Sequence, residues 1–466
     1  MSFILQLTDL LGSSAVLTTA GDMARYLSDE RDLYAGTATC VALPSSTAEV
    51  AAVVRLCAEQ GYTVVPQGGN TGYCGGASPD GKQQVLLSLS RLNKVRDIDP
   101  IGFTATVEAG VILANLHDVS EDKGLFFPLS MGSQGSCQIG GVLSTNAGGL
   151  AVLKYGTAGE LVLGLEVVLP NGEILNCLSP LRKDNTGYDL KSLFLGAEGT
   201  LGIITAAVLK LFPLPTEHQT AWLAVNSIED VCQLLALSRR LSGDTVTSFE
   251  YISQQSMQLA QTHIDGLHIP FAEPHAHQVL LELSGPLSPG SLRPVVESVL
   301  EEAMATGLVI DGVLADSASQ RQQLWRIRET LPEAEKLAGR SIKHDVSVAI
   351  SRIPQYLADI APELEAICAH RPSVYGHIGD GNLHYNVLAP INEDPVLFRS
   401  NYSSAISNAV HTLAAQMGGS FSAEHGIGKL KKADLARFKD PVALQLMKEL
   451  KNTLDPNGLM NPGKML

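Results

Sequence analysis

Four glycine-rich segments between residues 66 and 205 constrain the fold more than any other feature of the sequence. The first, PQGGNTGYCGG at residues 66–76, follows a short apolar stretch that we expect to form a buried strand. Glycine allows successive backbone N–H groups to point to one side, which makes a nest suited to a pyrophosphate. The other three are MGSQGSCQIGGVLSTNAGG at 131–149, YGTAGELVLG at 155–164 and NTGYDLKSLFLGAEGTLGIIT at 185–205. An ordinary turn is the alternative for the first segment alone, whereas four together predict close approach of the backbone to a large flat ligand.

The sequence argues against the two commonest nucleotide sites. The residues after the first segment, ASPDGKQQ, are polar and turn-like, whereas a nicotinamide-binding fingerprint opens a helix at this point. No GxxxxGK[ST] loop is present, so an ATP-type phosphate site is unsupported. The predicted ligand is therefore another dinucleotide.

Chain length and charge limit the classes of function. At 466 residues the chain is too long for one hydrophobic core, so we expect two domains. Its formal net charge of -15 is spread along the chain, which argues against a nucleic-acid partner and means that an anionic substrate would need a local cluster of cations. Seven cysteines without a CxxC pair fit a reduced compartment. Since there is neither a run of 18 apolar residues nor a positively charged secretory start, we expect no membrane span and a cytoplasmic enzyme.

Sequence periodicity predicts an α+β protein. A helix is expected over residues 46–60, where Ser46 and Glu49 form a capping box, and short strands then continue to a proline-rich boundary near residue 215. Beyond it strands and helices alternate, which favours two split βαβ units in one ferredoxin-like antiparallel sheet with helices on one face. The expected parts are an N-terminal helical segment (1–37), a dinucleotide-binding domain (38–215), a substrate or cap domain (216–420) and a C-terminal segment (421–466).

A second group of motifs predicts a metal site. YGHIGDGNLHYNV places His377 and His384 on either side of a GDGN turn, and the alternation of a strand puts Asn386 on the same face as His384. SAEHGIG supplies Glu424 next to His425. Two histidines and one carboxylate with open positions are typical of catalytic zinc or non-haem iron. For either segment alone, an ordinary core or surface histidine is the more common explanation.

Two cations could bind an anionic substrate. Arg328 lies in LWRIRETLPE on an expected helix, and Lys343 lies in SIKHDVSV just before an expected strand. Arginine suits a bidentate carboxylate clamp and lysine suits a second anionic end. The alternative is that both are solvated surface charges.

These motifs together resemble a known family. Residues 40–215 resemble the two-subdomain FAD-binding domain of the vanillyl alcohol oxidase and p-cresol methylhydroxylase superfamily, and residues 216–466 resemble the FAD-linked oxidase C-terminal domain. The resemblance implies non-covalent FAD, because members with covalent flavin have histidine where this chain has Asn70. The residues that it implies around FAD are Pro66, Gly68, Gly69, Asn70, Thr71, Gly72, Gly75, Ser133, Gly135, Ser136, Gly140, Gly141, Ser144, Asn146, Gly149, Gly156, Glu198, Gly199, Gly202, Ile203, Ile204 and Asn461.

The resemblance also implies roles for the second group of motifs. In metal-binding members the residues matching His377, His384 and Glu424 hold zinc or a similar divalent ion. By the same comparison, the substrate-binding residues are Arg328, Lys343, Asn386 and His425, and His425 is the general base. The resulting hypothesis is a metal-assisted oxidation in which His425 removes the hydroxyl proton of a D-2-hydroxy acid while a hydride passes to FAD.

Within the family, the combination WRIRE, KHD, GHIGDGNLHYN, SAEHGIGKLKK and LDPNGLMNPGK resembles the D-2-hydroxyglutarate dehydrogenases. Lys343 in its KHD context favours a dicarboxylate over D-lactate or glycolate, with D-malate as a further substrate, although Pro332 stands where some relatives have threonine. We expect a homodimer whose electron acceptor is electron transfer flavoprotein or a quinone rather than NAD. The alternatives are a D-lactate or glycolate dehydrogenase, a non-redox transferase like the alkyl-dihydroxyacetone phosphate synthases, and a flavin-binding protein without turnover.

Overall fold

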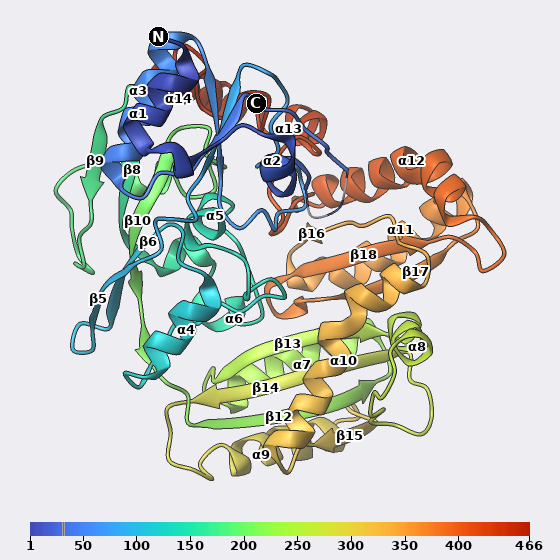
Figure 1. The fold of residues 1–466 in the computed structure, drawn as a ribbon. Coiled ribbons are helices and arrows are strands. Elements are labelled where there is room, and N and C mark those ends of the chain that lie inside the picture. Colours follow the sequence, from blue (N-terminus) through green and yellow to red (C-terminus); the bar gives the residue numbers. More distant parts are fainter. Residues whose placement is uncertain (30, 32) are drawn as a thin grey trace. The chain divides into compact units, whose positions relative to one another are not determined.

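The computed structural model describes residues 1–29, 31 and 33–466, which form two compact units (Figure 1). The first unit comprises residues 1–148, 156–213 and 424–466, and the second comprises residues 149–155 and 214–423. The main transitions follow residues 213 and 423, two and three residues from the expected boundaries at 215 and 420. The C-terminal segment therefore shares a unit with most of the glycine-rich segments.

The first unit contains a mixed four-stranded sheet in the order β1-β2-β4-β3. Strands β2 and β3 run parallel to β4 and are joined by helix α3, Thr47–Gln60. Ser46 caps α3 by accepting from the N–H of Glu49, and Gly61 ends the helix in the left-handed conformation. The Glu49 carboxylate accepts from the N–H of Ser45, whereas the expected capping box would use the N–H of Ser46. Near the C-terminus, residue 460 pairs with residue 64 of β3.

A second sheet of this unit has the order β5-β6-β10-β8-β9 and is antiparallel throughout, while β7 and β11 form a separate pair. The helices of the unit are α1 Phe3–Leu11, α2 Ala20–Leu27, α3, α4 Leu113–Glu121, α5 Ile139–Ser144, α13 Lys432–Phe438 and α14 Pro441–Leu454. Its strands are β1 Val16–Leu17, β2 Cys40–Ala42, β3 Thr63–Gln67, β4 Gln84–Ser88, β5 Val95–Asp99, β6 Thr104–Glu108, β7 Leu125–Phe126, β8 Val162–Val168, β9 Ile174–Cys177, β10 Ile203–Lys210 and β11 Phe212–Pro213.

The second unit is built on a seven-stranded antiparallel sheet in the order β15-β12-β14-β13-β17-β18-β16. Its strands are β12 Glu217–Val225, β13 Val246–Ser253, β14 His277–Gly285, β15 Asp311–Leu314, β16 Val346–Ser347, β17 Arg371–Gly376 and β18 Asn382–Leu388. Its helices are α6 Val152–Tyr155, α7 Ile228–Leu241, α8 Gln254–His263, α9 Arg293–Ala305, α10 Ala318–Leu337, α11 Ile353–Ile367 and α12 Pro395–Gln416.

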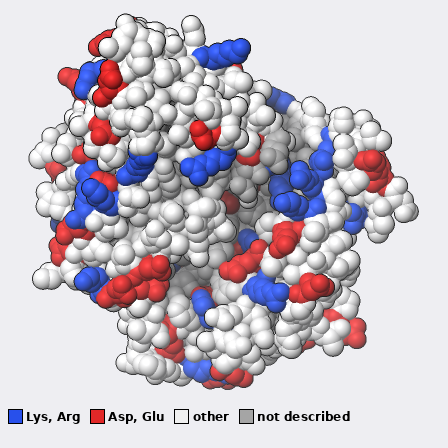
Figure 2. All heavy atoms as spheres, in the orientation of Figure 1, with Lys and Arg blue, Asp and Glu red and all other residues white. Residues whose placement is uncertain are grey.

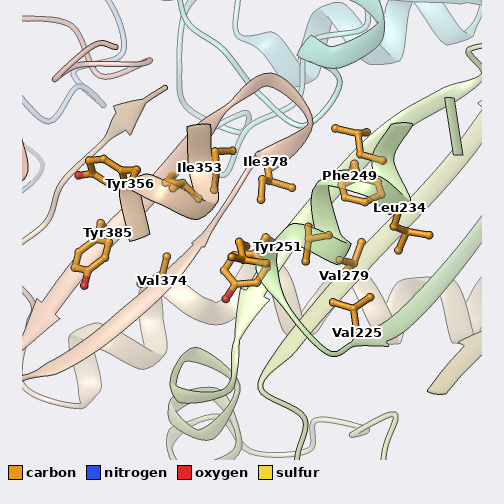
Figure 3. Packing of buried hydrophobic residues seen from close by; sticks show 14 of the residues in the cluster. Val225, Leu234, Phe249, Tyr251, Val279, Ile353, Tyr356, Val374, Ile378 and Tyr385 are labelled. Carbon is orange, nitrogen blue, oxygen red and sulfur yellow. The ribbon is translucent and has the colours of Figure 1, made fainter. Parts of the chain in front are cut away.

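The α+β class is confirmed, but the expectation of helices on one face of the antiparallel sheet is wrong. On one face, Phe249 and Tyr251 of β13 pack in a large core with residues of α7, α9, α11 and α12 (Figure 3). On the other face, Ile252 of β13 packs in a separate core with α8 and α10. The strands are apolar on both faces because both faces are covered, and this pattern does not reveal how the helices divide between them.

The described residues contain no helix with the length and apolar character needed to cross a membrane. Acidic and basic side chains are interspersed on the face shown in Figure 2. This distribution agrees with the spread of charges along the sequence.

Candidate active site

The first glycine-rich segment lies against the start of α5 in the first unit. A Cβ atom on Gly69 would lie 2.2 Å from the carbonyl oxygen of Ser136, and a Cβ on Gly140 would lie 2.7 Å from the side chain of Ala109. By contrast, a Cβ on Gly72 or Gly135 would meet no atom within 4 Å. Some glycines thus allow two backbone segments to touch, whereas others leave an open backbone surface that a ligand can approach.

Four predicted flavin-binding residues have a backbone conformation that is rare outside glycine. Asn70, Asn146, Glu198 and Asn461 have φ values of 57, 50, 50 and 41°. Such conformations cost free energy and persist where surrounding contacts impose them. Asn461 illustrates these contacts, because its side-chain N–H groups donate to the carbonyls of Gly76 (2.9 Å) and Glu198 (2.7 Å). The C-terminal segment is thereby tied to the first and last glycine-rich segments.

The Glu198 side chain holds the loop that follows His425. Its two carboxylate oxygens accept hydrogen bonds from the backbone N–H groups of Ile427 (2.7 Å) and Gly428 (2.8 Å). Burial raises the pKa of this carboxyl, and the two N–H donors oppose that shift. The ring of His425 lies edge-on to Tyr73 of the first glycine-rich segment, with 5.0 Å between ring centroids. Within this unit the proposed base is therefore positioned by two of the predicted flavin-binding segments.

These features of the first unit fit FAD. The open backbone at the first and second glycine-rich segments suits the pyrophosphate. Two buried acceptors, Gln138 Oε1 and Asn461 Oδ1, have no hydrogen-bond partner among the described residues, and flavin and ribityl groups offer donors. All of the predicted flavin-binding residues lie in this unit except Gly149, which belongs to the second.

In the second unit, a buried carboxylate joins two of the predicted site residues. Glu250 of β13 accepts from Nε of Arg328 at 2.8 Å and is bonded to Nδ1 of His377 at 2.7 Å. Burial raises the pKa of Glu250, but the interactions of its carboxylate with His377 and Arg328 outweigh this effect and lower the pKa to about 2. The guanidinium of Arg328 also lies over the Tyr375 ring, 4.9 Å from its centroid.

A second buried carboxylate joins the other two predicted substrate residues of this unit. Glu335 of α10 accepts from the side-chain amide of Asn386 at 3.0 and 3.1 Å and from Nζ of Lys343 at 3.2 Å. The amide oxygen of Asn386 accepts from the N–H of His344. Asn386 is thus held inside the unit, whereas the Lys343 side chain remains partly exposed. The departure at Pro332 falls within α10 on its exposed side.

The sheet also brings two of the predicted metal ligands close together. The rings of His377 and His384 lie 5.6 Å apart between centroids. Ligand atoms of Asp345 and His384, both in this unit, lie within 4.8 Å of each other. Sequence reasoning missed Asp345, although it ends the KHD motif that begins at Lys343. The third predicted ligand, Glu424, belongs to the first unit.

Glu250 and Glu335 were also missed. A charged residue inside an apolar strand, as in SFEYIS, was the available signal for Glu250. Nothing local distinguished Glu335 from the other acidic residues of its helix.

Comparison with known proteins shows the family to which the chain belongs. Residues 38–178 match a family model described as FAD binding domain, and residues 214–465 match one described as FAD linked oxidases, C-terminal domain. The fold and these matches define an FAD-binding oxidoreductase. The chain belongs to the FAD-linked oxidase family and is an FAD-dependent dehydrogenase.

Several relatives are named D-2-hydroxyglutarate dehydrogenases. A rice (Oryza sativa subsp. indica) protein named probable D-2-hydroxyglutarate dehydrogenase, mitochondrial, is 40% identical over 462 residues, covering 98% of this chain and 80% of the relative. The Bos taurus D-2-hydroxyglutarate dehydrogenase, mitochondrial, is 40% identical over 92% of this chain and 77% of its own. The D-2-hydroxyglutarate dehydrogenase of Xanthomonas citri pv. viticola is 37% identical over 99% of this chain and 96% of its own.

Solved structures support the fold. A p-cresol methylhydroxylase with substrate bound matches with a TM-score of 0.78 at 17% identity, over 99% of this chain and 96% of its own. An alkyldihydroxyacetonephosphate synthase matches with a TM-score of 0.75 at 17% identity, over 99% and 84%. At this identity the likeness extends to the fold alone.

The expected cytoplasmic location is wrong in the light of these comparisons. The rice, bovine and Arabidopsis thaliana relatives are each named as mitochondrial. A sequence without a secretory start does not distinguish these compartments, because the physical constraints on a folded enzyme are the same in both.

Proposed function

We propose that the protein oxidises D-2-hydroxyglutarate to 2-oxoglutarate with non-covalent FAD and a divalent metal ion, with D-malate as a further substrate. The names of the relatives support the substrate. The observation that carries the proposal is the pair of cations in the second unit, Arg328 and Lys343, each fixed by a buried carboxylate. A dicarboxylate is the substrate class that makes use of both.

Arg328 is suited to one carboxylate of the substrate. Its Nε is bonded to Glu250, and its two terminal nitrogens have no protein partner among the described residues. These nitrogens form the edge of the guanidinium that binds a carboxylate in a bidentate manner. The Tyr375 ring beneath it limits rotation of the guanidinium.

Lys343 is suited to the distal carboxylate. Its ammonium donates to Glu335, and the remaining N–H groups face a partly exposed region because 27% of the side chain is accessible. A charge-assisted hydrogen bond contributes about 1.5–3 kcal/mol. Lys343→Ala should therefore lower kcat/KM for D-2-hydroxyglutarate by roughly ten- to a hundredfold and leave D-lactate almost unaffected.

We assign the metal to His377, His384 and Glu424, with zinc as the expected ion. Imidazole and carboxylate donors suit this ion, and the short distance of 5.6 Å between the ring centroids of His377 and His384 supports the assignment. A divalent ion at such a site supplies Lewis acidity, which lowers the pKa of a bound hydroxyl group. His425 then accepts the hydroxyl proton on its ring, while FAD supplies the acceptor for the hydride from C2. The reducing equivalents are expected to leave through electron transfer flavoprotein or a quinone, and the enzyme is expected to be a homodimer.

An anaerobic substrate panel tests the proposal. Purified enzyme with FAD is mixed with D-2-hydroxyglutarate, D-malate, D-lactate or glycolate while the flavin absorbance is recorded. Fastest bleaching by D-2-hydroxyglutarate is expected. Fastest bleaching by D-lactate or glycolate would reassign the substrate, and no bleaching by any of them would favour a transferase without net oxidation.

The metal assignment is tested separately. Treatment with a chelator, or Glu424→Ala, should abolish turnover while the yellow flavin is retained. Full activity after both treatments would exclude the metal from the reaction.

A further inference from the structure

Glu250 is a carboxylate in an otherwise apolar strand. Its neighbours Phe249 and Tyr251 point into the core on one face of the sheet (Figure 3), while Glu250 points to the other face, toward α10. Its side chain is 1% exposed. A charge buried to this extent costs several kcal/mol unless it is paired and hydrogen-bonded. Glu250 is therefore stable in this strand only because its partners supply the pairing and the hydrogen bonds.

The two oxygens of Glu250 each bind a different site residue. Oε1 is bonded to Nδ1 of His377 at 2.7 Å, and Oε2 accepts from Nε of Arg328 at 2.8 Å. One carboxylate in one rotamer therefore fixes the imidazole proposed to bind the metal and the guanidinium proposed to bind the substrate. These partners are on separate elements, since His377 follows β17 and Arg328 lies on α10.

This contact determines which nitrogen of His377 carries the proton. An ionised carboxylate can only accept hydrogen bonds, so Nδ1 must be the N–H and, in the neutral ring, Nε2 carries the lone pair. A carboxylate behind a metal-binding histidine orients the ring and makes it a better ligand in this way. The orientation of Arg328 is determined by the same group, because bonding through Nε turns the two terminal nitrogens away from Glu250.

We propose that Glu250 is a positioning residue that sets the tautomer of His377 for metal binding and aims Arg328 at the substrate carboxylate. The inference rests on the function proposed above and deepens it, because it makes one buried side chain responsible for both metal affinity and substrate affinity. Glu250 itself does not touch the substrate in this arrangement.

The neighbouring strand provides a matched control. Glu282 of β14 is also buried, also faces α10 and also binds an arginine of that helix, Arg321, with two bonds of 2.7 Å. Its other strong partners are Trp325 (2.7 Å) and Thr220 (2.6 Å). None of them is a proposed metal or substrate residue, so Glu282→Gln disturbs the packing of α10 on the sheet without altering these ligands.

The experiment compares Glu250→Gln and Glu282→Gln with the wild type as FAD-loaded proteins. Zn²⁺ affinity is measured by competition with a chromophoric chelator, and KM is measured for D-2-hydroxyglutarate. Glu250→Gln should weaken Zn²⁺ binding about 10- to 100-fold and raise KM about tenfold or more, since a charge-assisted contact is lost. Glu282→Gln should change both by less than about threefold while lowering stability comparably. Wild-type Zn²⁺ affinity in Glu250→Gln, or an equal loss in Glu282→Gln, overturns the proposal.

The tautomer gives a readout that is independent of turnover. Histidine ¹⁵N spectra of metal-free protein, assigned with His377→Gln, should show a protonated Nδ1 in the wild type and in Glu282→Gln, and loss of this preference in Glu250→Gln. An unchanged tautomer in Glu250→Gln also overturns the proposal. Should the wild type bind no Zn²⁺, the metal assignment fails while these spectra still decide the role of Glu250.

If Glu250→Gln does not fold, Glu250→Asp takes its place. The carboxylate is kept, but the side chain is one methylene shorter and cannot reach both partners. Weaker Zn²⁺ binding or a raised KM is expected. Wild-type values for both would contradict the proposal.

Discussion

The buried carboxylate Glu282 makes the stability of the second unit depend on pH in a predictable way. It accepts from both Nε and Nη2 of Arg321, from Nε1 of Trp325 and from the hydroxyl of Thr220, and His218 lies 3.4 Å away. Burial alone would raise its pKa, but these partners lower the pKa from 4.5 to about 2. At about 1.4 kcal/mol for each pKa unit, this difference stabilises the folded state at neutral pH by roughly 3 kcal/mol.

The sign follows from proton binding. Because the folded-state pKa is lower, the unfolded chain takes up the proton first as the pH falls. The stabilisation is therefore present above pH 4.5 and is lost as the pH decreases from 4.5 through about 2. Glu282→Gln cannot accept all of these hydrogen bonds, so it should destabilise the protein by about 3 kcal/mol at pH 7 and should approach the wild type at low pH.

Urea unfolding followed by tryptophan fluorescence measures this effect directly. The chain has two tryptophans, Trp222 and Trp325, and both lie in the second unit, so the signal reports that unit alone. Unfolding free energies are compared between wild type and Glu282→Gln from pH 7 to pH 3. A difference that stays constant over this range would refute the ionic explanation and indicate lost packing. No difference at pH 7 would refute the inferred contribution of the ionised Glu282 to the free energy of unfolding.

Three further predictions concern the two units separately. Glu198→Gln leaves at least one backbone N–H of the loop after His425 without an acceptor, which costs about 1–3 kcal/mol. Hydrogen exchange at the two amides that Glu198 binds should therefore accelerate about 5- to 150-fold. Unchanged exchange rates would contradict the inference that Glu198 holds this loop. Gly69→Ala places a methyl group 2.2 Å from the Ser136 carbonyl oxygen and should reduce the amount of FAD retained after gel filtration. The control Gly21→Ala, whose methyl group meets no atom within 4 Å, should retain FAD fully. Equal retention by the two variants would contradict the inference that close packing at Gly69 shapes the FAD site. Arg328→Lys keeps the charge but removes the bidentate edge, and KM for D-2-hydroxyglutarate should rise about ten- to a hundredfold, so an unchanged KM would remove Arg328 from the substrate site.

The local sequence indicated which segments are candidates to carry the chemistry. Glycine spacing alone indicated backbone that a flat ligand can approach, and the histidines around the GDGN turn indicated a strand pair with both rings at one sheet end. The alternation of β18 predicted that His384 and Asn386 share a face, and the burial of Leu383, Tyr385 and Val387 in the opposite core agrees. The shared face of His384 and Asn386 was predictable because it depends on residues within a few positions of one another.

Tertiary structure decided which groups fix the site residues. The partners of Glu250 lie 78 and 127 residues away, and those of Glu198 lie 229 and 230 residues away. Strand alternation places Glu250 on the face opposite Phe249, but only the strand order β14-β13-β17 and the passage of α10 over that face bring Arg328 and His377 to it. The donors around a buried carboxylate determine its charge state and its role, and in this protein those donors lie on distant elements of the chain.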